Sequence, residues 1–517
     1  MFRDRRLTWH EVTDRTRRLA NVLHTAGLGC HTERSELANW ESGQDHLGIY
    51  CYNGNEYLEA MLGAFKARVA PFNVNYRYVA DELRYLLIDA APSALVFDTR
   101  FAETVAAVRA DVPSLRLLLQ IDDGSGDLLP GAVWYEEALA AAPATPPPVT
   151  PSPDDLYILY TGGTTGMPKG VLWRQGDAWQ ECFGGSRTAT TLDEVVAELA
   201  NPLRAVVAPP FMHGAGHWIA FRTWNTGGTV YVASHPERLD PADIWSTIER
   251  ERAEFLLIVG DAFARPLIDE LDRATYDLSC LTVLLSGGAA LSAPLKGQLL
   301  ARLPTLMIVD GLGSSEVGGQ LAQVATGGHA TTGTFPMTPG NHVLSADLTR
   351  VLAPGDPELG WLAKSGQLAL GYLHDRTKTG RTYPVIDGVR YGVPGDRARL
   401  TRDGTIELHG RDSVTINSGG EKIFAEEVEQ ALREHPGVYD CVVAPRPSDR
   451  WGQEVVAIVR RRDGCTPTES ELQATAERSI ARYKVPKAIV FVDEIVRSPS
   501  GKADYRWAKR VAEAGID

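Results

Sequence analysis

The chain has 517 residues, of which 44% are hydrophobic and 23% are charged, and its formal net charge is −14. A chain of this length is too long for one ordinary core, so at least two domains are expected. The acidic balance disfavours a nucleic-acid partner, because duplex binding depends on Lys and Arg clustered against phosphates.

The sequence contains neither a targeting signal nor a cysteine pattern typical of a zinc site. It contains no run of eighteen or more apolar residues, and the charged start at 1–11 is not followed by the apolar region of a signal peptide. We therefore expect no transmembrane segment and a cytoplasmic protein. The six cysteines occur singly, without a C-x-x-C pair, which argues against a zinc site or a disulfide framework.

The first elements follow a strand-and-helix alternation. Thr8 and Glu11 have the spacing of a capping box, and apolar residues then recur at helical spacing up to Gly27. Short apolar runs that end at Gly, Pro or Asp near an expected helix are typical of buried strands. These runs are Leu95–Phe97, Ala205–Val207, Phe255–Val259 and Val283–Leu285. The alternation predicts a layered α/β body.

The proline-rich stretch Ala140–Pro153 is expected to be a surface connection.

The carboxy-terminal part of the chain has a different pattern. Near the end, a helix around Val428 is predicted to stop before Pro436, and strands are expected near 438–443 and 455–459. We predict a large multi-subdomain α/β domain over 1–411 and a small α+β domain over 412–517, joined by a hinge.

A glycine-rich loop follows an apolar strand at 157–170. Glycines let backbone N–H groups approach phosphate oxygens, and the loop adds three hydroxyls, a proline and Lys169. A lone glycine-rich turn would more often be structural, but this combination favours phosphate binding. The loop is not a Walker A motif, because Gly170 follows the lysine.

Residues 161–171, TGGTTGMPKGV, resemble the phosphate-loop signature of the superfamily that contains acyl- and aryl-CoA synthetases, peptide-synthetase adenylation domains and luciferases. Four further motifs follow in the order of that superfamily. The resemblance implies that the loop binds ATP and that Thr164 also contacts a metal ion. The loop residues implied in ATP binding are Thr161, Gly162, Gly163, Thr164, Thr165, Gly166 and Lys169.

The first further motif is similar to the aromatic-Gly-x-Thr-Glu segment of the superfamily. It implies that Glu316 helps to hold Mg2+ on ATP, and a magnesium–phosphate unit needs few protein carboxylates. Leu312 stands where an aromatic residue usually stacks on adenine. The implied nucleotide-binding residues here are Asp310, Gly311, Leu312, Gly313, Ser314 and Ser315, with Gly288 and Ala289 upstream.

Two other motifs supply a carboxylate and a lysine. Residues 391–396 resemble the segment whose Asp, here Asp396, accepts hydrogen bonds from the ribose hydroxyls. Residues 498–502 resemble the terminal motif whose lysine, here Lys502, reaches the α-phosphate and the substrate carboxylate during adenylation. One such contact is typically worth ~3 kcal/mol at the transition state. Taken alone, these segments would be a turn and a surface lysine.

The remaining motif, residues 410–423, resembles the hinge and the glycine-rich loop that starts the small domain. The resemblance assigns Arg411 to the ribose and puts the pivot at Asp412 or Ser413. A glycine-rich surface turn is the alternative. The residues implied in coenzyme A binding are Ser418, Gly419, Gly420, Glu421 and Lys422.

Residues 209–218 lie where the superfamily has a His or an aromatic residue beside the acyl carboxylate. His213 is the better candidate for a catalytic role, and His217 is the weaker. Trp218 is either a core residue or a gate of the acyl pocket, to which Gly260 is also assigned.

The resemblance implies an ATP-dependent, AMP-forming carboxylate–CoA ligase, with ATP, Mg2+ and coenzyme A as cofactor and co-substrates. Residues 159–174, 259–266 and 416–422 look most like those of actinobacterial fatty-acyl and steroid side-chain CoA synthetases. This resemblance implies a medium- or long-chain fatty acid or a bulky steroid acid as the partner. A homodimer is left open. The alternatives are an amino- or aryl-acid adenylating enzyme without CoA transfer, and a catalytically silent acyl-nucleotide binding protein.

Overall fold

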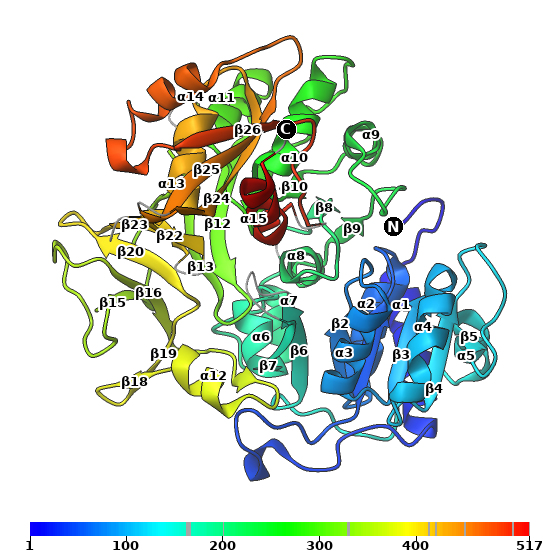
Figure 1. The fold of residues 1–517 in the computed structure, drawn as a ribbon. Helices are drawn as coiled ribbons and strands as arrows, with labels where there is room; N and C mark the ends of the chain where they lie inside the picture. The colour runs from blue at the N-terminus through cyan, green and yellow to red at the C-terminus, as the bar shows by residue number, and fades with distance from the viewer. Residues whose placement is uncertain are drawn as a thin grey trace.

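The computed structural model describes residues 1–161, 167–199, 201–327, 331–411, 414–418, 421–448, 451–498 and 501–515. Figure 1 shows a large body, coloured blue to yellow, with a smaller orange and red unit seated beside its green part. We call residues 414–515 the small domain and the residues before them the large domain. Within the described residues, no helix is both long and apolar enough to cross a membrane.

The first sheet of the large domain has the strand order β17-β7-β6-β2-β1-β3-β4-β5 in the described part of the chain. The neighbours β2, β1, β3 and β4 run parallel, and all residues of β1 and β3 are buried, as expected for a sheet covered by helices on both faces. The strands are β1 His46–Tyr50, β2 Ala70–Asn73, β3 Ala94–Asp98, β4 Leu117–Ile121, β5 Val133–Trp134, β6 Leu156–Thr161, β7 Lys169–Arg174 and β17 Gly371–Tyr372.

Helices of the amino-terminal half accompany this sheet. The first has the predicted capping box, in which the Thr8 hydroxyl accepts the Glu11 N–H (3.3 Å) and the Glu11 carboxylate accepts the Thr8 N–H (2.7 Å). Residues 142–155, which follow α5, form neither helix nor strand, as predicted for the proline-rich stretch. Ala140 and Ala141, which the prediction included in that stretch, instead end α5, because alanine favours helix and the first proline comes only at Pro143. The helices are α1 Trp9–Thr25, α2 Asn55–Lys66, α3 Ala80–Ala90, α4 Ala102–Val108, α5 Tyr135–Ala141, α6 Gln175–Glu181 and α7 Leu192–Ala197.

The second sheet has the order β13-β12-β11-β10-β8-β9, and all its pairs are parallel except β12 with β13. Three of the apolar runs seen in the sequence form β8, β10 and β11. The strands are β8 Arg204–Val207, β9 Thr229–Tyr231, β10 Phe255–Ile258, β11 Val283–Gly287, β12 Met307–Ser314 and β13 Gly318–Ala325. The helices are α8 Gly214–Trp224, α9 Pro241–Glu251, α10 Gly260–Leu271 and α11 Ala293–Arg302.

This second sheet determines where the predicted site residues lie. The carboxyl ends of parallel strands meet at one edge of a sheet, which is the usual ligand-binding edge of such folds. His213 follows β8, Gly260 follows β10, Gly288 follows β11, and Glu316 follows β12. Four motifs that are far apart in the sequence therefore converge at one edge.

A third, antiparallel sheet has the order β14-β21-β20-β16-β19-β18, with β15 paired to β16. It carries Asp396 at the start of β20 and Arg411 at the end of β21. The strands are β14 Thr334–Pro336, β15 Asn341–Leu344, β16 Gly360–Ser365, β18 Val385–Ile386, β19 Val389–Gly392, β20 Asp396–Leu400 and β21 Thr405–Arg411, and the helix is α12 Arg376–Thr382.

The small domain has a sheet and hydrophobic clusters of its own. Its sheet has the order β23-β22-β25-β24, with β26 beside β25. Its core contains Val428 and Leu432, as the helical spacing predicts. The pivot residues of the predicted boundary, Asp412 and Ser413, lie outside the described residues, so the boundary stays a prediction. The elements are β22 Thr415–Ser418, β23 Glu421–Phe424, α13 Ala425–Arg433, β24 Val438–Ser448, β25 Gly452–Arg461, α14 Glu469–Ala476, β26 Ala488–Val492 and α15 Tyr505–Ala514.

Candidate active site

The terminal lysine lies against the large domain. A turn positions it, in which the Gly501 N–H bonds to the Ser498 carbonyl and the Ser498 N–H to the Lys502 carbonyl, both at 2.8 Å. A Cβ added at Gly288, in the loop after β11, would lie 3.9 Å from Cε of Lys502. The carboxy-terminal motif and the loop after β11 are therefore in contact.

The charge of Lys502 is governed by this environment. Its side chain keeps access to solvent, although atoms of both domains surround it. Desolvation and then repulsion by Arg411 lower the pKa of Lys502 to about 8, while Glu316 and Asp396 act in the opposite direction. Among the described residues its ammonium has no hydrogen-bond partner, so it is available to an anionic ligand.

The two residues assigned separately to the ribose, Asp396 and Arg411, lie next to each other. Asp396 and Arg411 are register partners in the antiparallel pair β20–β21, and the Arg411 Nε donates to Asp396 Oδ1 at 3.2 Å. Asp396 is buried, and its negative charge is the largest cause that raises the pKa of Arg411. The Asp396 carboxylate can accept further hydrogen bonds besides the one from Arg411, so it suits a ligand that offers hydroxyl donors.

Two tyrosines hold Glu316, and the sequence did not indicate either of them. The Tyr372 hydroxyl donates to Glu316 Oε1 at 2.7 Å, and the Tyr383 hydroxyl donates to the Glu316 carbonyl at 3.1 Å. In the described part of the chain the second carboxylate oxygen has no partner. Magnesium bound to phosphates needs only one or two protein carboxylates, so this oxygen fits such an ion. The other predicted metal contact, Thr164, lies outside the described residues.

The phosphate loop is described only at its two ends. Gly162, Gly163, Thr164, Thr165 and Gly166 lie outside the described residues. Their flanks are register partners, because Thr161 ends β6 and Lys169 begins β7 in an antiparallel pair.

The Lys169 ammonium forms an ion pair with Asp375, which the sequence analysis missed. Asp375 also caps α12 by accepting the Lys378 N–H at 2.8 Å. An Asp directly before a helical segment was the available sequence signal.

The segment 310–315 forms the end of β12 and the turn that leads to β13. Asp310 points into the protein, where the fully buried Lys296 ammonium donates to its Oδ2 at 2.7 Å. Leu312 packs beside the cluster that contains Leu321 and Phe335. Gly311, Gly313, Ser314 and Ser315 remain partly accessible, as does Ala289 in the neighbouring loop. Any nucleotide contact from this segment would therefore not involve the Asp310 carboxylate while it is paired.

The two histidines differ in their hydrogen bonding. His213 Nε2 is buried and has no hydrogen-bond partner in the described part of the chain. Burial, followed by the positive charge of Lys502, lowers the pKa of His213 to about 3, so its imidazole is neutral. His217 is fully satisfied, because Nδ1 donates to the Phe211 carbonyl at 2.5 Å and Nε2 accepts from the Tyr157 hydroxyl. His217 is thus structural, in line with its weaker candidacy.

Trp218 belongs to the same network, since its Nε1 donates to the Tyr157 hydroxyl at 3.0 Å. Its ring also limits the space over α8, because a Cβ at Gly214 would lie 3.1 Å from it. Gly260 has a φ of 52°, and a Cβ there would lie 2.5 Å from the Ala290 carbonyl oxygen. A glycine is therefore required where the loop after β11 meets α10.

The residues assigned to coenzyme A are not gathered at Lys502. Ser418, Glu421 and Lys422 belong to the β22–β23 hairpin, where Ser418 and Glu421 are register partners. No hydrogen bond or ion pair joins them to Lys502 in the part of the chain that the structure describes. Asp412, Ser413, Gly419 and Gly420 lie outside the described residues.

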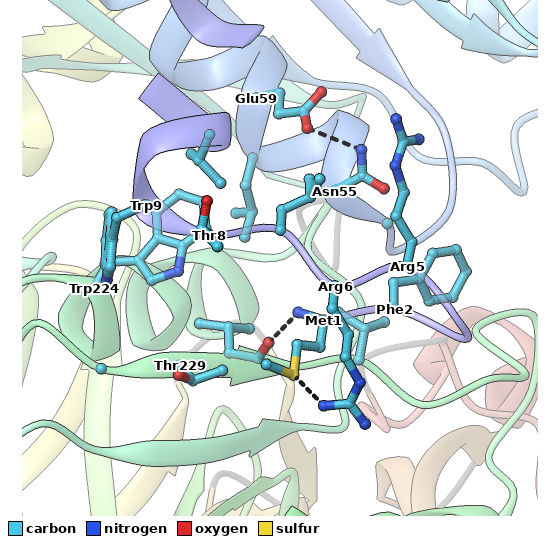
Figure 2. A pocket seen from close by; sticks show the side chains of 17 residues that line it. Met1, Phe2, Arg5, Arg6, Thr8, Trp9, Asn55, Glu59, Trp224 and Thr229 are labelled. Carbon is cyan, nitrogen blue, oxygen red and sulfur yellow. Dashed lines mark hydrogen bonds between the residues drawn. The ribbon is translucent and has the colours of Figure 1, made fainter. Parts of the chain in front are cut away.

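A separate cavity of about 360 Å3 lies between the amino-terminal segment, α1, α2 and β9. Figure 2 shows Trp9 and Trp224 on one side of it and Met1, Phe2 and Arg5 on the other. None of the predicted site residues lines this cavity, so it is distinct from the edge where Lys502 and Glu316 lie.

The chain has relatives among known proteins along almost its whole length. The chain is 54% identical over 520 residues to the medium-chain acyl-CoA ligase Mig of Mycobacterium avium, a match that covers 99% of this chain and 94% of the relative. It is 41% identical to a medium/long-chain-fatty-acid–CoA/3-oxocholest-4-en-26-oate–CoA ligase of Mycobacterium tuberculosis, over 99% of this chain and 92% of the relative.

The fold resembles that of the anthranilate CoA ligase AuaEII in complex with anthranoyl-AMP. The TM-score is 0.82 at 19% identity, with 99% of this chain and 94% of that chain covered. The family model described as AMP-binding enzyme matches residues 1–373, and that of its C-terminal domain matches residues 427–502. The chain therefore belongs to the family of AMP-binding enzymes.

Proposed function

We propose that this protein is an ATP-dependent, AMP-forming carboxylate–CoA ligase that acts on a medium- or long-chain fatty acid or a steroid side-chain acid. The observation that carries the proposal is the position of Lys502. An ammonium without a hydrogen-bond partner among the described residues lies at the edge of the second sheet that carries Glu316, within electrostatic reach of Asp396 and Arg411 of the third sheet. A cation there suits the charge that develops when an acid attacks ATP.

In the first step, a carboxylate oxygen of the acid attacks the α-phosphorus of ATP. A new P–O bond forms, the bond to the β-phosphate breaks, and pyrophosphate leaves with its electron pair. We assign Lys502 to the developing charge and neutral His213 to the acyl carboxylate. Glu316 would hold Mg2+, which supplies charge neutralisation on the phosphates when bound.

In the second step, the thiol sulfur of coenzyme A attacks the acyl carbonyl carbon. The carbon–sulfur bond forms, the carbon–oxygen bond to AMP breaks so that AMP leaves with its electron pair, and the thiol proton is released to water. We infer that the small domain turns about the hinge between the steps, because Ser418 and Glu421 lie in the β22–β23 hairpin and have no hydrogen bond or ion pair to Lys502 among the described residues. Coenzyme A would then approach past this hairpin.

The class of acid substrate is inferred from the names of two relatives. Mig is named for medium-chain acids, and the second relative for medium- and long-chain fatty acids and a cholestenoate. We propose Trp218, in the first half of α8, as the gate of an apolar acyl pocket. We also propose a cytoplasmic location, and a homodimer stays a prediction.

The test uses the purified chain with ATP, Mg2+, coenzyme A and a mixed pool of medium-chain, long-chain and steroid acids. Mass detection of acyl-CoA products together with AMP is the expected result. Acyl-adenylate without any thioester would favour an amino- or aryl-acid adenylating enzyme. Absence of both products from the whole pool would favour a silent binding protein and overturn the proposal.

A further inference from the structure

Helix α10 presents three charged residues to the small domain. Asp261, Arg265 and Asp269 are spaced by four residues, so they lie on one face of the helix. Figure 1 shows α10 directly beside the orange strands of the small domain. All three side chains contact residues of the small domain.

The contacts follow one another along the helix. The Asp261 Oδ2 lies 3.7 Å from Nε of Arg433, and both side chains are almost fully buried. The Arg265 guanidinium lies 4.9 Å from the centre of the Tyr439 ring. One turn further on, the Tyr439 hydroxyl donates to Asp269 Oδ2 at 3.1 Å.

From this surface a chain of hydrogen bonds leads to Lys502. Asp440, next to Tyr439, accepts two bonds of 2.7 Å from the Arg497 guanidinium. The Arg497 Nη1 donates to the carbonyl of Gly501 at 3.0 Å. Gly501 directly precedes Lys502. The Asp440–Arg497 contact therefore helps to fix the position of the Lys502 backbone.

The same helix also holds the loop after β11. The Asp261 Oδ1 accepts the Ser292 N–H at 2.7 Å, and the Asp261 N–H donates to the Ala290 carbonyl at 3.2 Å. This loop contains Gly288, which lies against Lys502. Asp261 therefore touches the loop with one oxygen and the small domain with the other.

We propose that the face of α10 formed by Asp261, Arg265 and Asp269 is the docking surface that places Lys502 for adenylation. The three are positioning residues, because they act through Tyr439, Arg433 and the loop after β11. The inference rests on the proposed two-step function and adds the surface that holds the first arrangement. It requires these contacts in the adenylation step alone, since the small domain leaves them when it turns.

The test measures the two half-reactions separately in Asp269→Ala, Tyr439→Phe and the double variant. Adenylation is followed as acid-dependent pyrophosphate release without coenzyme A, and thioester formation from synthetic acyl-AMP with coenzyme A. We expect kcat/KM for adenylation to fall about tenfold in each single variant, as for one hydrogen bond to a charged group. The double variant should lose no more than either single one, with thioester formation unchanged.

Glu270→Ala and Tyr276→Phe are matched controls. They break a hydroxyl–carboxylate bond of 2.7 Å at the next residue of α10, inside the large domain, and should leave both half-reactions unchanged. Equal losses in both half-reactions, or additive losses in the double variant, would overturn the docking surface. If the unaltered chain performs neither half-reaction, the proposed function itself fails, which is a distinguishable outcome.

Discussion

At the scale of single residues, Lys502 combines solvent access with a pKa lowered to about 8. The ammonium is therefore mostly charged at pH 7 and mostly neutral at pH 9. The cause lies in the tertiary environment, since desolvation and Arg411 both oppose the charge. A terminal lysine in the sequence carries no sign of this.

The pH profile of adenylation should report that pKa. We expect kcat/KM for acid-dependent pyrophosphate release to fall above pH 8, approaching a tenfold loss per pH unit, because the charged form is the active one. In Lys502→Arg, which stays charged, a slower reaction without this decline is expected. An unaltered chain with a flat profile up to pH 9.5 would contradict the assignment.

Glu426 also has a shifted pKa. Its Oε2 is buried without a hydrogen-bond partner in the described structure, and a Cβ at Gly410 would lie 2.7 Å from it. Burial, followed by repulsion from Glu429, raises the pKa of Glu426 to about 8. The folded chain thus holds a proton between pH 4.5 and 8 that the unfolded chain releases, so this group lowers stability as pH rises through that window.

Glu426→Gln should remove this loss. We expect the variant and the unaltered chain to have similar free energies of unfolding below pH 5. At pH 9 the variant should be more stable by about 3 kcal/mol, from 1.4 kcal/mol per pKa unit reduced for solvent access. Urea unfolding at several pH values measures the difference, and a gap that does not depend on pH would refute the explanation.

At the scale of elements, the turn before Lys502 packs against the start of α10. Gly501 has a φ of 73°, and a Cβ there would lie 3.2 Å from the Val259 carbonyl oxygen and 3.3 Å from the Ala262 Cβ. The turn therefore needs glycine for two reasons, its backbone conformation and the close approach of the large domain. From the sequence, a glycine before a lysine indicates only a turn conformation, and the close approach of the large domain is visible only in the structure.

Gly501→Ala separates these two reasons when it is compared with Gly464→Ala. Gly464 has a φ of 76° with nothing within 4 Å of an added Cβ, so it tests the backbone alone. Both variants should lose about 1–2 kcal/mol of stability in urea unfolding. Only Gly501→Ala should also reduce adenylation, by about tenfold or more, and equal adenylation rates in the two variants would count against close seating.

At the scale of the whole molecule, the small domain carries a residue that completes the edge of the second sheet. Lys502 belongs to a chain segment more than a hundred residues after that sheet ends at Ala325. In the proposed mechanism, the first half-reaction therefore depends on the orientation of the two units, and the second requires the lysine to leave.

Lys502→Ala should show this division. We expect adenylation to fall about a hundredfold, which corresponds to ~3 kcal/mol for one lost charge contact. Thioester formation from supplied acyl-AMP and coenzyme A should keep most of its rate. Lys509→Ala, on the exposed part of α15, is a control for charge loss, and a similar decline of both half-reactions in Lys502→Ala would contradict separate arrangements.

Local pattern determined much of this protein. The capping box of α1, the strands at 205–207 and 283–285, the helix stopped before Pro436 and the order of the five motifs follow from the sequence. Such features depend on neighbouring residues, whose spacing and backbone preferences are visible in the chain itself. The family and its nucleotide chemistry were predictable for the same reason.

Only the tertiary structure decided which side chains meet. It paired Asp310 with Lys296, Glu316 with Tyr372, and Lys169 with Asp375, and it brought α10 against Tyr439 of the small domain. These partners are far apart in the sequence and belong to different elements. Their contacts and pKa values arise from packing and desolvation, which exist only once the chain is folded.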